Sequence, residues 1–162
     1  MNELFAPPGN DWRPVSPQLR RLRRTVLMVD VAVGLALVGI AAAVLGWTRW
    51  WLVPGGLLLL VLLAGWPLIG RNVRHWGYAE RDEDLYIKHG ALFRELIAVP
   101  YGRMQFVDVT AGPLEQLFGV ATVRLHTASP STGARIPGLP AEDAARLRDR
   151  LSQLGEAQAA GL

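Results

Sequence analysis

Hydrophobic and polar positions follow two different patterns along this chain. Residues 25–46 and 52–70 are apolar runs, and Asp30 is the only charged residue in either run. As helices with a rise of 1.5 Å per residue, the runs would reach about 33 Å and about 28 Å, and the hydrocarbon core of a bilayer is about 30 Å thick. The pattern therefore predicts two membrane-spanning helices.

The connection between the predicted spans is five residues long and holds three tryptophans. A connector this short forces the two helices into an antiparallel hairpin, so both chain ends lie on the same side of the bilayer. Gly34, Gly39 and the alanines at 41–43 give the first helix a smooth surface. We interpret this surface as a contact within the hairpin, with an interface between copies of the chain as the alternative.

Arginines beside the spans indicate which side holds the chain ends. Arg49 is the only arginine in the connector, and six others flank the hairpin on the side of the termini: Arg20, Arg21, Arg23, Arg24, Arg71 and Arg74. The positive-inside rule then places both termini in the cytoplasm, with these six arginines at anionic lipid headgroups of the bilayer. Because the basic cluster adjoins a span, we expect no nucleic acid partner.

A secretory signal peptide is the alternative interpretation of residues 20–46. The apolar core of a signal peptide is usually 7–15 residues long, and here a longer run is followed directly by a second span. Sixteen arginines against one lysine suggest the codon usage of a GC-rich bacterial genome. We therefore expect a multi-pass protein of a bacterial plasma membrane.

Asp30 is the intramembrane polar position, and an ionisable group inside a span is a functional candidate. It would lie only about 7 Å from the start of the apolar run. Reaching the interface, or pairing with Arg71 or Arg74 on the second helix, is the simpler interpretation. A small transporter or proton-coupled protein that uses Asp30 is the alternative function.

Residues 1–19 contain four prolines and bury little, so they predict a flexible cytoplasmic arm before the hairpin at 20–76. Within this arm, Ser16 followed by Pro17 is typical of a helix start. The first helix is thus expected to begin well before the bilayer.

From residue 77 the apolar period changes to two, which is typical of strands. Alternation predicts three strands, around Leu85 and Ile87, along 105–109 and along 121–125, and residues 93–99 form a fourth that Pro100 ends. Gly90 marks a hairpin turn, residues 111–119 have room for one helical turn, and residues 129–133 read as a loop.

The C-terminal segment is helical, since Ala144, Leu147, Leu151 and Leu154 recur at spacings of three and four. Strands followed by one amphipathic helix predict an antiparallel β-barrel or sandwich capped by that helix. The expected organisation is therefore a transmembrane hairpin followed by an α+β domain at 77–157 and a tail at 158–162.

Composition excludes several functions. The chain has no cysteine, and His75, His89 and His126 are far apart, so no metal motif is present. It also lacks a nucleophile elbow, a phosphate-binding loop and a dinucleotide fingerprint. We therefore expect neither catalysis nor a cofactor. The net charge of +3 divides into +5 for residues 1–76 (eight arginines, three acids) and −2 for residues 77–162 (nine bases, eleven acids).

Three ordered motifs resemble the bacterial pleckstrin-homology type 2 (PH-like) family. Residues 99–109, VPYGRMQFVDV, resemble its P-x-x-R-I-Q-x-V-x-V signature, residues 112–121, GPLEQLFGVA, resemble G-P-L-x-R-x-F-G-L-A, and residues 127–129, TAS, resemble T-A-G. Two spans followed by one such domain resemble the YdbS-like bacterial membrane proteins. Gln116 and Ser129 depart from the family pattern, which puts in doubt any contact that needs the missing positive charge.

The resemblance implies a bent antiparallel barrel with a C-terminal helix, and no catalytic activity. Relatives often occur beside a larger protein with several such domains, which implies a complex with another membrane protein that has PH-like domains. Candidate docking residues are Arg103, Gln105, Phe118 and Thr127. A structural role is the interpretation that we favour for the first three, and both roles stay open for Thr127. The loop that joins the first two strands of the domain, residues 80–84, has four acids and one base. It would repel an anionic headgroup, so phosphoinositide binding is not expected.

Overall fold

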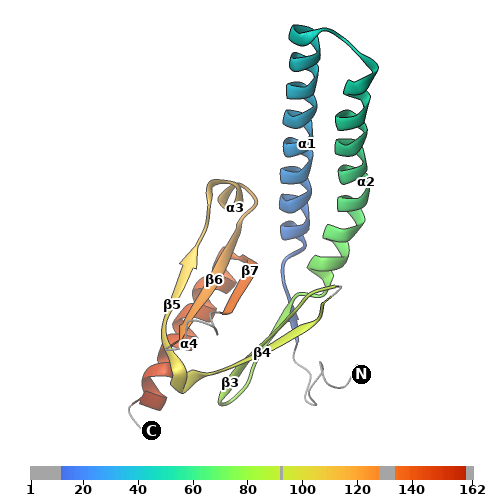
Figure 1. Cartoon of the computed structure of the whole chain (residues 1–162). Coiled ribbons are helices and arrows are strands. Elements are labelled where there is room, and N and C mark those ends of the chain that lie inside the picture. Colours follow the sequence, from blue (N-terminus) through green and yellow to red (C-terminus); the bar gives the residue numbers. More distant parts are fainter. Residues whose placement is uncertain (1–11, 92, 128–133, 160–162) are drawn as a thin grey trace.

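Two long helices project from one end of a β-rich domain (Figure 1). The computed structural model describes residues 12–91, 93–127 and 134–159. Helix α1 spans Pro17–Leu45, a short 3-10 turn covers Arg49–Trp51, and helix α2 spans Leu52–Arg74. Ser16 caps α1 by accepting a hydrogen bond from the Gln18 amide, as the sequence predicts.

Both helices are long and apolar enough to cross a bilayer. Their most apolar 18-residue windows are 11% and 0% buried by the rest of the chain. A core helix of a soluble protein would be mostly covered by protein, so these faces need another apolar environment.

The two helices meet through small residues. A Cβ atom added at Gly34 would lie 3.1 Å from Leu58, and one added at Gly65 would lie 2.9 Å from Leu27. A Cβ at Gly39 would meet nothing within 4 Å. Gly34 and Gly65 thus serve hairpin contact, whereas Gly39 does not.

The domain is built from two antiparallel sheets. The first has the order β1-β2-β3-β4, with β1 at Arg13–Pro14, β2 at Gly77–Glu80, β3 at Asp84–His89 and β4 at Glu95–Pro100. The second has the order β5-β6-β7, with β5 at Met104–Thr110, β6 at Val120–Thr127 and β7 at Ala134–Pro140.

Three short or terminal elements complete the domain. A 3-10 turn at Tyr101–Arg103 joins the sheets, helix α3 at Pro113–Leu117 connects β5 to β6, and helix α4 covers Ala141–Ala159. The predicted strands, the single helical turn and the C-terminal helix are confirmed. Helix α4 extends past the boundary predicted at residue 157, and the predicted loop at 129–133 lies outside the described residues.

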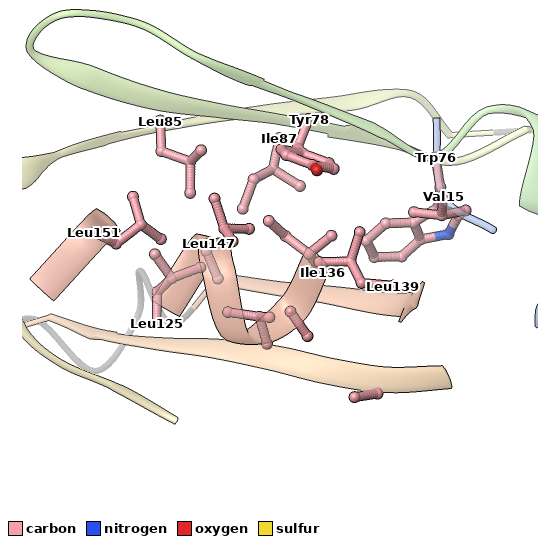
Figure 2. Close-up of a cluster of buried hydrophobic side chains, with 14 of the residues drawn as sticks. Val15, Trp76, Tyr78, Leu85, Ile87, Leu125, Ile136, Leu139, Leu147 and Leu151 are labelled. Carbon is pink, nitrogen blue, oxygen red and sulfur yellow. The ribbon is translucent and has the colours of Figure 1, made fainter. Parts of the chain in front are cut away.

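The core lies between the two sheets and α4, and Figure 2 shows side chains from all three pointing toward one another. Leu85 and Ile87 come from β3, Leu125 from β6, and Leu147 and Leu151 from α4, and each is at most 1% exposed. The alternation and the helical stripe in the sequence therefore identified the side chains that fill this core.

The N-terminal boundary predicted from the sequence is wrong. Arg13–Pro14 pairs with β2, and Val15, Leu19 and Leu22 are buried in the domain core. Because β1 precedes the hairpin and β2 follows it, the hairpin is an insertion within the first sheet. Residues 12–19 are thus part of the domain and not of a flexible arm, while residues 1–11 lie outside the description.

The strand β7 was not predicted. Its sequence, ARIPGLP, contains two prolines and a glycine, which are depleted in strands. Gly138 has a φ of +72°, and the Ser16 amide donates a hydrogen bond of 2.9 Å to its carbonyl oxygen. The backbone of β7 is thus irregular at Gly138, where the start of α1 packs against the strand.

Candidate functional site

An open groove runs between β5 and α4. It has a volume of 330 Å³ and is lined by Met104, Gln105, Phe106, Val107, Leu151, Ser152, Gly155 and Glu156. We call this the edge groove. One wall is strand and the other is helix, and the lining mixes apolar side chains with an amide, a hydroxyl and a carboxylate.

Strand β5 lies at the edge of its sheet, where it pairs with β6 on one side. The pairing register skips between Met104 and Phe106, so Gln105 sits at a β-bulge. Bulges are common at sheet edges, where they interrupt regular pairing and redirect a side chain. Gln105 therefore lines the groove from a bulged position of β5.

The side chain of Phe106 is 52% exposed beside the groove. Its ring stacks on His126 of β6 with the centroids 4.1 Å apart, and His126 Nε2 lies 3.3 Å from Asp108 Oδ2. Stacking fixes the orientation of the phenyl ring while half of it remains available for contact. The arrangement suits recognition of a peptide segment.

The structure brings three of the four predicted docking residues together. Arg103 ends the 3-10 turn just before β5 and Gln105 is the second residue of β5, and both are exposed. Thr127 is half-buried at the end of β6, next to them, because Met104 and Thr127 are paired in register. Phe118 lies apart from these three, partly buried against the core behind α3.

The α4 wall of the groove was missed in the sequence. Ser152 and Gly155 are one turn apart on α4, and the small Ser152 side chain and the absence of a side chain at Gly155 leave the space that the groove occupies. Two small residues three apart on an amphipathic helix were the available signal.

The interpretation of residues 80–84 as one acidic loop needs correction. Glu80 ends β2 and Asp84 begins β3, so only residues 81–83 connect the strands. The Glu80 side chain is 8% exposed and forms ion pairs with three arginines: Arg13 at 3.6 Å, Arg146 at 3.5 Å and Arg150 at 3.2 Å. The Glu80 cluster therefore joins β1, β2 and α4, and its carboxylate has a structural role.

Tyr101 is buried beside the Glu80 cluster, and this position changes the pKa of its hydroxyl group. Its hydroxyl donates a hydrogen bond of 2.8 Å to the Arg81 carbonyl oxygen. Burial, and then the negative charge of Glu80, raise the pKa of Tyr101 above its ordinary value. Burial also raises the pKa of Tyr78, so both phenols stay neutral over a wider pH range than a free tyrosine.

Several arginines at the base of the hairpin bind protein groups. Arg23 donates to Asn72 Oδ1 at 2.9 Å, and the same oxygen accepts a hydrogen bond of 3.2 Å from the Trp76 indole. Arg24 donates to the Trp66 carbonyl oxygen and lies 4.5 Å from the Trp66 ring centroid. These contacts connect α1 to α2. Arg20 is half-buried, while Arg21, Arg71 and Arg74 are exposed.

Asp30 is exposed on α1. The salt bridges of the described residues do not include it, so the expected pairing with Arg71 or Arg74 is absent. Within the part of the chain that the structure describes, no three acidic, histidine or cysteine side chains are grouped as a metal site requires.

Comparisons with known proteins agree with this architecture. Residues 22–155 match the family model described as bacterial PH domain. The chain is similar to the transmembrane protein YdbS of Bacillus subtilis (strain 168), with 35% identity over 152 residues that cover 91% of this chain and 92% of the relative. No solved structure matches.

The match includes both helices of the hairpin and the two sheets, and the relative of almost equal length is itself named a transmembrane protein. Two apolar helices whose faces the chain leaves uncovered agree with that name. This chain is therefore a YdbS-like membrane protein with a PH-like α+β fold, and it belongs to the bacterial PH domain family.

Proposed function

We propose that this protein is a non-enzymatic interaction module held at the plasma membrane of a bacterium. Its edge groove binds an extended segment of a second membrane protein that itself carries PH-like domains. The observation that carries the proposal is the open groove between an edge strand and α4, with Phe106 half-exposed beside it.

Strand addition is the mechanism that this geometry favours. An edge strand offers main-chain donors and acceptors, and side-chain pockets next to it select the segment that binds. In the edge groove, Phe106 offers an aromatic contact, and Gln105 and Ser152 offer hydrogen bonds to a peptide. Because the bulge at Gln105 interrupts regular pairing, it disfavours indiscriminate pairing with other strands.

Membrane attachment favours binding even where the affinity of the edge groove for its partner is low. Two proteins held in the same bilayer meet at a higher effective concentration than two proteins in solution. The hairpin is joined to the domain through the core, since Leu19 and Leu22 of α1 and Val73 of α2 are buried there. The groove is thus presented to neighbouring membrane proteins in a limited set of orientations.

The expected orientation places both termini and the domain in the cytoplasm. It is supported by the six arginines on the side of the termini against Arg49 in the connector. The test uses the absence of native cysteine: single cysteines replace Thr48, in the connector, and Ser152, on α4. A maleimide that does not cross membranes should label intact cells at position 48 and not at position 152, and the reverse pattern would contradict the orientation.

A photo-crosslinking amino acid at position 152 or 153 tests the groove directly. Both residues are exposed on α4, but Ser152 lines the groove and Gln153 does not. Crosslinking in cells should join position 152 to a membrane protein with PH-like domains, and position 153 should give at least tenfold less of that product. Equal products from both positions, or a product that contains this chain alone, would contradict the proposal.

Filling the groove provides the matching loss of function. Ser152→Trp should reduce co-purification of that partner by about tenfold or more in mild detergent, the loss expected when an interface core is blocked. Gln153→Trp adds the same volume one residue away and should leave co-purification unchanged.

The alternative of a transporter that uses Asp30 finds no support in this geometry. Asp30 is exposed on α1 and has no second ionisable partner among the described residues. Asp30→Asn is expected to leave partner binding intact.

A further inference from the structure

Few large apolar side chains of the domain are exposed. Among the described residues outside the hairpin there are four: Phe93 at 90%, Leu117 at 78%, Phe106 at 52% and Leu114 at 49%. Phe106 belongs to the edge groove. The other three lie in two connections, the β3–β4 turn and α3, that the proposed function does not use, and we call them the membrane-side patch.

The β3–β4 turn brings Phe93 next to the inner end of α2. Gly90 allows the tight turn with a φ of +94°, and an added Cβ there would collide with the Phe93 carbonyl group. A cavity of 470 Å³ lies between the turn and the hairpin, lined by Arg23, Leu68, Ile69, Asn72, Gly90, Ala91 and Phe93. Leu68 lies near the end of the second apolar run, is 47% exposed, and lines this cavity together with Phe93. Phe93 therefore lies at the level where the predicted span ends.

Helix α3 lies at the end of the second sheet nearest to the hairpin, beside α1 (Figure 1). A Cβ added at Gly119, just after α3, would lie 3.6 Å from the Gln18 amide oxygen in the first turn of α1. Glu115 holds α3 in place, since its two carboxylate oxygens accept hydrogen bonds of 2.8 Å from the Gly112 amide and the Thr122 hydroxyl. Leu114 and Leu117 are thus presented outward from a fixed helix.

The junction between hairpin and domain fixes where both connections lie relative to the hairpin. Leu19, Leu22 and Val73 enter the domain core, and the Ser16 amide bonds to β7. The domain therefore cannot swing away without opening its own core. Phe93 thus stays beside Arg23, with which it lines the cavity, and α3 stays near the first turn of α1.

We propose that the membrane-side patch inserts into the leaflet on the domain's side and that phospholipid occupies the cavity beside Phe93. Exposed apolar side chains next to basic residues are the chemistry that binds the headgroup and acyl boundary of a bilayer. Leu68, an exposed residue of the second apolar run, lines the cavity, and Arg23 borders it. A guanidinium has five N–H donors, so the bond from Arg23 to Asn72 leaves donors for a phosphate oxygen.

The lipid contact adds a second attachment of the domain to the bilayer, besides the hairpin itself. This inference is independent of the proposed partner. It depends only on the hairpin crossing the bilayer, and the leaflet involved is the one on the domain's side whichever way the hairpin is oriented.

The test measures insertion depth with the full-length chain in lipid nanodiscs that contain anionic phospholipid. Single cysteines replace Phe93, Leu117 or Phe106, and each carries an environment-sensitive fluorophore, since the chain has no native cysteine. Phe106 is the matched control, an exposed phenylalanine away from the patch. None of these side chains is buried, so the substitutions leave the core intact.

Lipids with a nitroxide near the glycerol end of the acyl chain should quench the fluorophores at 93 and 117 at least threefold more than the one at 106. Aqueous iodide should show the opposite order. Equal quenching at all three positions by the nitroxide lipid would overturn the proposal. Protection of positions 93 and 117 from both quenchers would also overturn it, because a protein would then cover the patch.

Discussion

The hairpin and the domain contain the same apolar residue types but bury them differently. In the domain, Leu85, Ile136 and Leu147 have no exposed surface, while in the hairpin Leu60 is 61% exposed and Leu63 is 76% exposed. The domain satisfies its apolar side chains by internal packing, and the hairpin leaves them for lipid. Residue type alone thus does not say what will cover a side chain.

The comparison also shows that the two regions are not consecutive pieces of chain. The core takes Val15 and Leu19 from before the hairpin and Trp76 from after it. Trp76 stacks on His89 with the ring centroids 4.7 Å apart, so the exit from the hairpin is held by the first sheet. The domain therefore needs both ends of the hairpin in order to fold, and cutting the chain at residue 77 would open its core.

The largest difference between the regions should appear when a leucine is truncated in each. Leu147→Ala removes a fully buried side chain and should lower the free energy of unfolding by about 2–5 kcal/mol. Leu60→Ala removes an exposed side chain of α2 and should change it little. Thermal unfolding of the purified protein in detergent, followed by tryptophan fluorescence, compares the two, and similar losses would contradict the division into protein-covered and lipid-covered regions.

The junction between the regions should be almost as sensitive as the core. Gly138→Ala forces a left-handed residue with a φ of +72° to carry a Cβ, which would lie 2.5 Å from the Leu19 Cβ. Backbone strain and overpacking together should cost about 2–4 kcal/mol in the same assay.

Gly39→Ala is the matched control within the hairpin. An added Cβ there meets nothing within 4 Å, and alanine favours helix, so no loss is expected. If Gly138→Ala were equally silent, the start of α1 would not be packed on β7.

The Glu80 cluster tests whether charge holds β1 to the rest of the domain. Glu80→Gln leaves Arg13, Arg146 and Arg150 without their shared carboxylate, and these arginines are exposed enough to turn to water. The expected loss is about 1.5–3 kcal/mol, the range for hydrogen bonds to a charged group. Glu156→Gln, an exposed carboxylate on α4, should have no effect, and equal behaviour of the two variants would argue against a structural role for Glu80.

The smallest effect concerns pH. Tyr101→Phe removes the hydrogen bond to the Arg81 carbonyl and should cost about 0.5–1.5 kcal/mol at neutral pH. Because the pKa of Tyr101 is raised in the folded state, its contribution is fully present below about pH 10, its unfolded pKa, and is lost as the pH rises through the folded value. Stability measured from pH 8 to 12 should fall less steeply in the variant, and an unchanged slope would contradict this assignment.

Local patterns were sufficient for most of the elements. Alternation around Leu85 and along residues 121–125 predicted strands, and the stripe from Ala144 to Leu154 predicted the helix that covers the core. These signals are local because the period of apolar side chains must match the period of the element that buries them. The Ser16 cap was likewise readable, since a cap depends on two adjacent residues.

Non-local pairings were not readable in this way. Arg13–Pro14 is too short to have a period, and it becomes a strand because β2, more than sixty residues later, pairs with it. Glu80 looked like one acid among four, and only α4 and β1 supply the arginines that surround it. At the candidate site, Gln105 was recognisable within the β5 motif, whereas Ser152 acquired its place from the packing of α4 beside that strand.

Local periods and motifs were enough to predict the two apolar helices, the strands β3, β4, β5 and β6, the closing helix and the resemblance to the bacterial PH family. Only the folded chain shows that the hairpin is inserted within a sheet and that the edge groove forms between β5 and α4. It also placed Phe93 beside Leu68, at the end of the span. These features depend on contacts between residues far apart in the chain, which form only when burial of the shared core brings them together.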